Sequence, residues 1–171
     1  AKLGNSHMAL VPIYSHLAVL SRRIGDFPSS LEFLQLALAV VQQLKGDCHC
    51  TYATALMHLS VHYHAQQEMA QAEIYAKQAL RLKQELLGAD HLHVGLIHYD
   101  LAIILGKRSL FKESVQSLSS ALSIFEKKLY LDHPFTIQAK QAMLQAEDLI
   151  IDQSIEDSQQ AVKGFIEPKD Q

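Results

Sequence analysis

A repeat of about 42 residues is the feature that most constrains how this chain folds, because a period of this length is typical of proteins built from stacked units. Leu17-Ala18 recurs as Leu59-Ser60 and again as Leu101-Ala102, at the same interval each time. In such repeat proteins similar units share one continuous core. Three copies in register, without insertions, predict three similar units. Other positions keep the same interval: Ala37, Ala79 and Ala121; Ser30, Ala72 and Ser114; His49, His91 and His133.

Each copy is predicted to form two helices. Apolar side chains recur three and four positions apart, as in Tyr14, Leu17 and Leu20. This spacing places them on one face of a helix, whereas a strand would need strict alternation. Small residues such as Ala18 and Ala37 are expected where the paired helices meet. We expect helices at 10–25, 29–45, 51–66, 69–87, 93–108, 111–129 and 134–152.

The repeat register also divides the chain into parts. Residues 1–8 lack periodicity and end in His-Met, so we interpret them as the remnant of an expression tag and leave them out of the fold. Residues 153–171 are expected to form a short helix or a disordered tail. We expect further chain before residue 9, because no polar helix covers that end. The array spans 9–152, with copies at about 9–48, 49–90 and 91–132 and a closing helix at 133–152.

The residues of these copies resemble the tetratricopeptide repeat (TPR). A helix pair with Leu-Ala early, a small residue near the start of the second helix and Ala-Leu late is similar to that repeat. The linkers Gly88-Ala89-Asp90-His91 and Leu131-Asp132-His133-Pro134 look like those of the kinesin-light-chain type. The resemblance implies an all-α fold, a right-handed TPR superhelix of three antiparallel helix pairs plus a C-terminal closing helix. It also implies a concave face, lined by the first helix of each pair, that holds a peptide or a partner helix.

Two aspartates in these linkers are candidates for helix caps. Asp90 and Asp132 lie just before the first helices of the third and fourth units. A short side-chain oxygen at such a position accepts hydrogen bonds from free backbone N–H groups. We therefore expect the two aspartates to cap these helices.

The register assigns the residues that would line the concave face. TPR domains that capture acidic C-termini of heat-shock proteins resemble one another in Asn and Lys at the first two columns, which this chain lacks, so that kind of carboxylate clamp is not expected. The face is instead apolar with a basic end, which suits a peptide or an amphipathic helix with apolar anchors and acidic flanks. The alternative is that this face packs on another helix of the same protein. The predicted groove residues are Ser15, Met57 and Tyr99; Val19, Val61 and Ile103; and Arg22, Arg23, His64 and Lys107.

Histidines and cysteines raise the question of a metal site. His58 and His62 lie four apart on one predicted helix, and the register would bring His16 and Asp100 near His58. Two spaced ligands make a weak motif, because a site needs a third or fourth ligand. The run from Cys48 to Cys50 falls in a linker, where free thiols in a reducing compartment are the simpler interpretation. We therefore predict no metal and no cofactor.

Composition and missing motifs narrow the function further. The net charge of −3 argues against a nucleic-acid binder, and no apolar run approaches the roughly 18 residues that would insert in a membrane. Phosphate-binding glycine loops and nucleophile motifs are absent, so we predict no enzyme and no catalytic residues. No signal peptide is visible, and we expect a cytoplasmic location. The predicted function is an adaptor that binds a protein or peptide. The alternative is a structural module that packs on a neighbouring domain or forms homo-oligomers.

Overall fold

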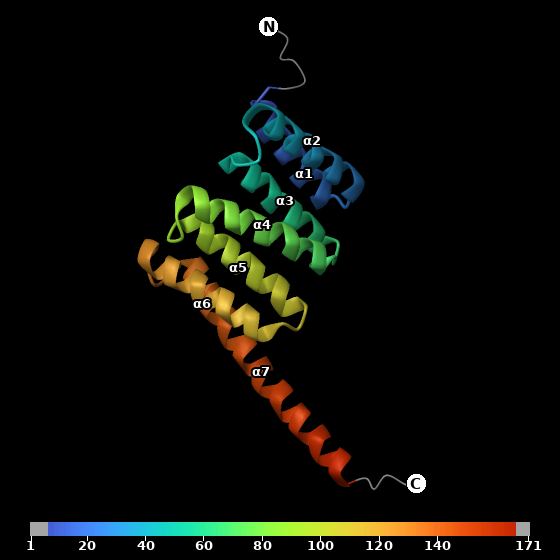
Figure 1. Ribbon diagram of the computed structural model, residues 1–171, viewed down its shortest axis with the longest axis vertical. Coiled ribbons are helices and arrows are strands. Elements are labelled where there is room, and N and C mark those ends of the chain that lie inside the picture. Colours follow the sequence, from blue (N-terminus) through green and yellow to red (C-terminus); the bar gives the residue numbers. More distant parts are fainter. Residues whose placement is uncertain (1–6, 167–171) are drawn as a thin grey trace.

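The computed structural model describes residues 7–166, with side chains through residue 159. Antiparallel neighbours pack as pairs, and α7 packs on α6 (Figure 1). This part of the chain is the predicted all-α, right-handed superhelix of three antiparallel pairs followed by a closing helix. Its helices are α1 (Leu10–Arg23), α2 (Phe27–Lys45), α3 (Cys50–Ala65), α4 (Met69–Leu87), α5 (Leu92–Lys107), α6 (Phe111–Lys128) and α7 (Pro134–Ile166).

Small side chains lie where the helices of a pair meet, as the sequence predicts. Ala102 is fully buried, and its backbone carbonyl accepts a hydrogen bond of 2.8 Å from Ser114 Oγ on α6. Ser60 Oγ donates an equivalent bond of 2.8 Å to the carbonyl of Ala72 on α4. A hydroxyl can reach the backbone of its partner helix only when the two helices lie close together. The small residues therefore set the spacing within each pair.

Replacing Ala102 by leucine is expected to destabilise the fold. Extra methylenes at a packed contact force side chains off their rotamers or push the backbone apart, at a cost of about 1–3 kcal/mol. Thermal unfolding followed by circular dichroism would measure the loss. The same change at Ala39, an exposed position on α2, is the control and should alter stability by about 0.5 kcal/mol or less.

The closing helix is longer than predicted. We expected it to end near residue 152 and a separate short helix or tail to follow. Instead, α7 continues without a break to Ile166 and extends well beyond the stack of helix pairs (Figure 1). The remaining residues of the predicted tail, 167–171, lie outside the described part of the chain.

The turn that ends each earlier first helix explains this difference. These turns contain a residue with positive φ at one register position: 84° at Gly25, 65° at Gln67 and 59° at Ser109. In the fourth copy the same position is Ile151. A β-branched side chain strongly disfavours positive φ. The turn is therefore not formed, and the helix continues.

The linkers correct the predicted helix caps. The residue that caps α3 is His49, whose Nδ1 accepts a hydrogen bond of 3.2 Å from the backbone N–H of Thr51. His91 caps α5 in the same way, and His133 accepts from Phe135 N–H at 3.2 Å. The prediction that Asp90 and Asp132 cap these helices was wrong. In each of these linkers the histidine one position after that of the aspartate caps the helix.

The first described residues also follow the repeat register. His7 lies one repeat before His49, and its Nδ1 accepts a hydrogen bond of 3.1 Å from Ala9 N–H. Met8 packs against a core cluster that contains Val41. Leaving residues 1–8 out of the fold was therefore wrong for His7 and Met8. Their origin in an expression tag stays a prediction.

Candidate partner-binding groove

The first helices of the pairs lie together on one side of the superhelix. Here α1 contacts α3 and α5 contacts α7. This arrangement places the predicted groove residues of α1 beside α3 and those of α5 beside α7. Arg23 and Lys107 are exposed. The other eight predicted groove residues are half-buried: Ser15, Val19, Arg22, Met57, Val61, His64, Tyr99 and Ile103.

Three of the predicted residues line one pocket between α1 and α3. This pocket has a volume of about 230 Å³, and Val19, Val61 and Arg22 form part of its wall. The aliphatic side chains give it an apolar surface, whereas the Arg22 guanidinium places a positive charge beside that surface. The rest of the lining is Ala18, Ser30, Leu34, His58 and His62.

A second pocket of about 190 Å³ lies between α5 and α7 and contains Ile103 and Lys107. Every residue of the first pocket has its counterpart here, two repeats later in the sequence. Ile103 takes the place of Val19, and Gln145 takes the place of Val61. Lys107 lies one position beyond the counterpart of Arg22 and supplies the positive charge. The repeat therefore builds the same pocket twice along one face.

The other predicted groove residues line neither of these two pockets. Met57 packs partly against the core cluster around Leu56 and Leu59. Tyr99 packs against the cluster around Phe125. Met57 and Tyr99 therefore contribute mainly to the core, and each side chain is only partly open to solvent. The remaining residues of this group are Ser15, Arg23 and His64.

Histidine His62 has an unusual setting in the first pocket. It is fully buried, with Nδ1 at 3.0 Å from Ser30 Oγ, and its Nε2 has no hydrogen-bond partner. Burial and the nearby Arg22 charge lower the pKa of His62, and the same two causes, with His16, lower the pKa of His58. Burial, Lys107 and Arg22 lower the pKa of His64. These rings are therefore neutral at pH 7, and Arg22 supplies the charge of the pocket.

Asp100 occupies the same register position on α5 as His58 on α3. Burial alone raises the pKa of Asp100 to about 6, so no nearby cation compensates its charge. The predicted approach of His16 to His58 is seen in their electrostatic interaction. Asp100 does not join them in a metal site, because no three His, Cys, Asp or Glu side chains of residues 7–159 lie close enough to hold a metal ion. The three side chains thus do not form one cluster.

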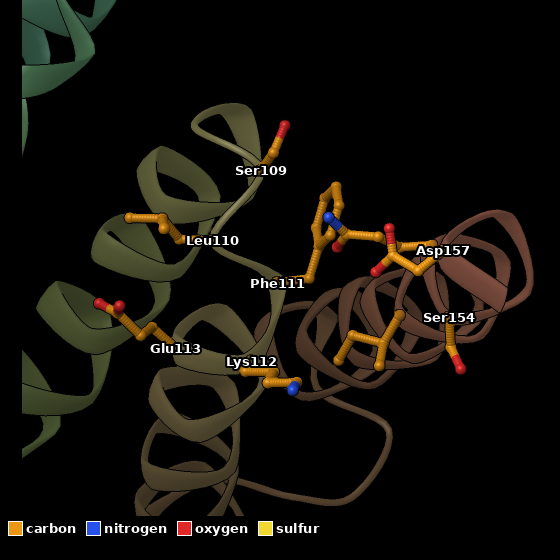
Figure 2. A pocket seen from close by; sticks show the side chains of 9 residues that line it. Ser109, Leu110, Phe111, Lys112, Glu113, Ser154 and Asp157 are labelled. Atoms are coloured by element: carbon orange, nitrogen blue, oxygen red, sulfur yellow. The ribbon is translucent and has the colours of Figure 1, made fainter. Parts of the chain in front are cut away.

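A separate cavity of about 490 Å³ lies where α7 passes the start of α6. Figure 2 shows its two walls, Ser109 to Glu113 on one side and Ser154 and Asp157 of α7 on the other. It exists because α7 continues past the position where the earlier first helices turn. None of the ten predicted groove residues lines it. We therefore place the candidate site in the repeated pockets.

Metal ligands do not cluster in the part of the chain with described side chains. No group of three or more His, Cys, Asp or Glu side chains in residues 7–159 lies close enough to hold a metal ion. His58 and His62 thus have no third ligand there. Over the same part of the chain, every helix is too short or too polar to cross a bilayer.

The family of the chain follows from comparison with known proteins. The model of the tetratricopeptide repeat matches residues 8–83 and again residues 51–127. These matches cover most of the chain. The chain belongs to the tetratricopeptide repeat family. A search of curated protein sequences gives no match.

Solved structures agree with this TPR assignment. The nearly identical TPR-like repeats of a Podosopora anserina protein described as a kinesin light chain superpose with a TM-score of 0.77 at 17% identity, over 95% of this chain and 79% of that one. BtubC (BKLC) from P. vanneervenii gives a TM-score of 0.67 at 20% identity, over 95% of this chain and 67% of that one. At such identities the likeness establishes the fold. The prediction of TPR repeats is confirmed.

Sequence reasoning missed part of this TPR groove. It considered His58 and His62 only as a possible metal pair, which it rejected, and did not connect His62 with Ser30. A signal was available, because the column of His62 holds Leu20 and Ile104 in the neighbouring copies. A histidine in an apolar column indicates a buried polar contact, but its partner lies on another helix that the column does not identify.

Proposed function

We propose that this TPR array is a non-catalytic adaptor that binds a peptide or an amphipathic helix along its concave face. The observation that supports it is the pair of equivalent pockets, each with an aliphatic wall and a basic side chain beside it. An extended ligand would place one apolar side chain in each pocket. Acidic residues next to these anchors would meet Arg22 and Lys107, since carboxylates form charge-assisted hydrogen bonds with such cations.

The composition of the pockets favours apolar anchors over a purely ionic contact. Val19, Val61 and Ile103 are half-buried and still partly open to solvent. Covering such surface gains roughly 25 cal/mol per Å², whereas an exposed ion pair gains about 1 kcal/mol or less. The apolar contacts would therefore supply affinity, and the cations would supply orientation and selectivity. The proposal includes action in the cytoplasm and does not involve nucleic acid.

Changing Val61 and Ile103 together to aspartate is expected to abolish partner binding. Each carboxylate would fill a pocket with charge that an apolar anchor cannot compensate. Immobilised wild-type and variant chains would be compared for the proteins they retain from a lysate, with the relative amounts measured by mass spectrometry. We expect the specific partners to fall at least tenfold on the variant while helicity by circular dichroism is unchanged.

The matched control places two aspartates elsewhere on the solenoid. Ile74 and Leu86 on α4 are 48% and 42% exposed and lie outside both pockets. Changing both to aspartate should leave the retained partners unchanged. Equal retention by the groove variant and the wild type would contradict the proposed groove and move the binding site to another face.

A second candidate function, assembly through the two ends, has its own support. The outer face of α1 exposes Ile13, Leu17, Leu20 and Ile24, whereas the equivalent residues Ala55 and Leu59 of α3 are buried against α2. At the other end α7 exposes Leu144, whose equivalent Ala102 is buried against α6. Both faces thus correspond to surfaces that are buried between helices elsewhere in the repeat, but here no described helix covers them. The other exposed large apolar residues of α7 are Phe135, Ile137, Leu149, Ile151 and Ile155.

Charge favours a head-to-tail contact between these two ends. Arg22 and Arg23 follow the α1 face, whereas the exposed turns of α7 carry Glu147, Asp148 and Asp152. A contact of one end with the other end of a second copy is heterologous and leads to rings or filaments. Light scattering over a concentration series would detect it as a rising mass. Leu20→Asp should abolish the rise, Leu36→Asp on α2 should not, and a constant mass of the wild-type chain would contradict this second function.

A further inference from the structure

The repeat reveals one place where the core departs from its own pattern. In the third copy Phe125, at the end of α6, is fully buried, and Leu92 and Leu96 of α5 pack against its cluster. In the first copy the position of Phe125 is Val41, also fully buried. In the second copy the same position is Lys83, which is only 3% exposed.

The two neighbours of this lysine have changed as well. Where the third copy has Leu92 and Leu96, the second copy has Cys50 and Thr54. Lys83 Nζ donates to Cys50 Sγ at 3.0 Å and to Thr54 Oγ1 at 2.9 Å. A set of three apolar side chains has thus been replaced by a lysine, a thiol and a hydroxyl that contact one another.

The buried ammonium lacks a carboxylate. Among the ion pairs of residues 7–159 none involves Lys83. Taking a charge out of water without a partner of opposite sign is costly, so buried charges are normally paired. Of its two contacts, the cysteine sulfur is the one that forms an anion readily. The buried ammonium therefore faces a nucleophilic sulfur at 3.0 Å.

Two further features of this site are shared with reactive cysteines. Cys50 is the first residue of α3, where free backbone N–H groups and the helix dipole attract negative charge. Reactive cysteines are typically found at helix N-termini, beside a lysine and partly open to solvent. Cys50 is half-buried, so small reagents can reach it.

We infer that Cys50 and Lys83 form a reactive thiol site that is modified by peroxides and by soft electrophiles. With hydrogen peroxide as the oxidant, the thiolate attacks one peroxide oxygen, an S–O bond forms and the O–O bond breaks. The sulfur loses two electrons to the peroxide. The departing hydroxide takes a proton from solvent and becomes water, and Cys50 becomes a sulfenic acid. Lys83 contacts the reacting sulfur and holds its negative charge without taking part in the bond changes.

The reactivity of Cys50 can be compared with that of Cys48, which is exposed and lies two residues away. Two single-cysteine chains, Cys48→Ser and Cys50→Ser, would be treated with hydrogen peroxide or iodoacetamide at pH 7. Intact mass would follow the gain of oxygen or of the alkyl group. We expect Cys50 to react at least tenfold faster than Cys48, although Cys48 is the more exposed thiol. A faster or equal rate at Cys48 would overturn the inference.

The role of the lysine is tested in the chain that retains Cys50. Lys83→Met removes the charge and supplies the apolar side chain that the other copies have, so the fold should be kept. We expect the rate at Cys50 to fall about tenfold, and Lys83→Arg should restore most of it. Lys77→Met, on the exposed side of α4, is the control and should leave the rate unchanged. An unchanged rate in Lys83→Met would refute the role of Lys83.

Discussion

Replacing Asp100 by asparagine is expected to stabilise the chain by about 2–3 kcal/mol at pH 7. Burial raises the pKa of this carboxyl group to about 6, from an ordinary value of 3.8. One unit of pKa corresponds to about 1.4 kcal/mol of difference between the two protonation states. At neutral pH the folded chain must therefore hold a half-buried carboxylate without a compensating cation. Asparagine keeps the size of the side chain and removes the charge.

The stability gained by Asp100→Asn should become smaller as the pH falls. Between pH 3.8 and about 6 the folded chain holds a proton on Asp100 that the unfolded chain has lost. The stability of the wild type therefore falls as the pH rises through this window. Below it, both states are protonated, and the advantage of Asp100→Asn should disappear. Urea unfolding of both chains at pH 7 and pH 4 would measure the two differences.

An exposed acid provides the control for this substitution. Asp152→Asn, on the exposed part of α7, should change stability by about 0.5 kcal/mol or less at either pH. If Asp100→Asn also changed stability no more than that, the Asp100 carboxylate would have to be compensated in the folded chain. Burial would then not be the dominant influence on it.

The fold of this chain was predictable because one register carries most of the information. Each small residue that spaces a helix pair recurs once in every repeat, so Ala18, Ser60 and Ala102 predict one another. The register also predicted some of the residues that line the pockets, since Val19 and Val61 line the same pocket between neighbouring first helices. Periodicity thus determines both the helix faces and the order in which they stack.

What the register could not predict are the places where one copy differs from the others. The length of α7 depends on whether Ile151 accepts a positive φ, which is a backbone property of one residue. The contacts of His62 with Ser30 and of Lys83 with Cys50 join side chains on different helices, far apart in the sequence. Such pairs become visible only when the packing of neighbouring helices is known. The same departures from the pattern are the positions with unusual chemistry.

Lowering the pH from 7 to 5 is expected to destabilise the chain through its buried and half-buried histidines. Burial lowers the pKa of His58, His62, His64 and His98, so these rings bind protons less readily in the folded chain than in the unfolded chain. The unfolded chain takes up protons on them below about pH 6.5. The unfolded state then binds more protons, and stability falls as the pH falls, by up to about 1.4 kcal/mol per pH unit for each ring that stays neutral. Unfolding in urea at pH 7, 6 and 5 would measure this slope.

Asp100 acts in the opposite direction over part of this range. Its proton uptake in the folded chain stabilises the fold as the pH falls below about 6. The loss should therefore be steepest between pH 6.5 and 6 and partly offset below that. In the Asp100→Asn chain the offset is absent, so its stability should fall more steeply toward pH 5 than that of the wild type.

The repeat supplies the variant that tests His62 itself. At the positions of Ser30 and His62 the next copy has Ala72 and Ile104, both buried. The double change Ser30→Ala and His62→Ile removes the ring whose Nε2 is unpartnered and its hydroxyl contact together. Replacing both partners of a buried hydrogen bond by apolar groups is nearly neutral or stabilising. We expect the free energy of unfolding at pH 7 to stay the same or to rise by about 1 kcal/mol. Between pH 7 and pH 5 the free energy of unfolding should fall less steeply than in the wild type, because the contribution of the His62 ring is gone.

The control is the exposed Gln35 on α2. Gln35→Ala should leave the slope of stability against pH unchanged, because neither side chain takes up a proton in this range. If the double variant retained the full slope, His62 would have to accept a proton inside the fold without loss. The pocket beside it would then be able to hold a second positive charge next to Arg22, and acid would strengthen the attraction of this groove for carboxylates.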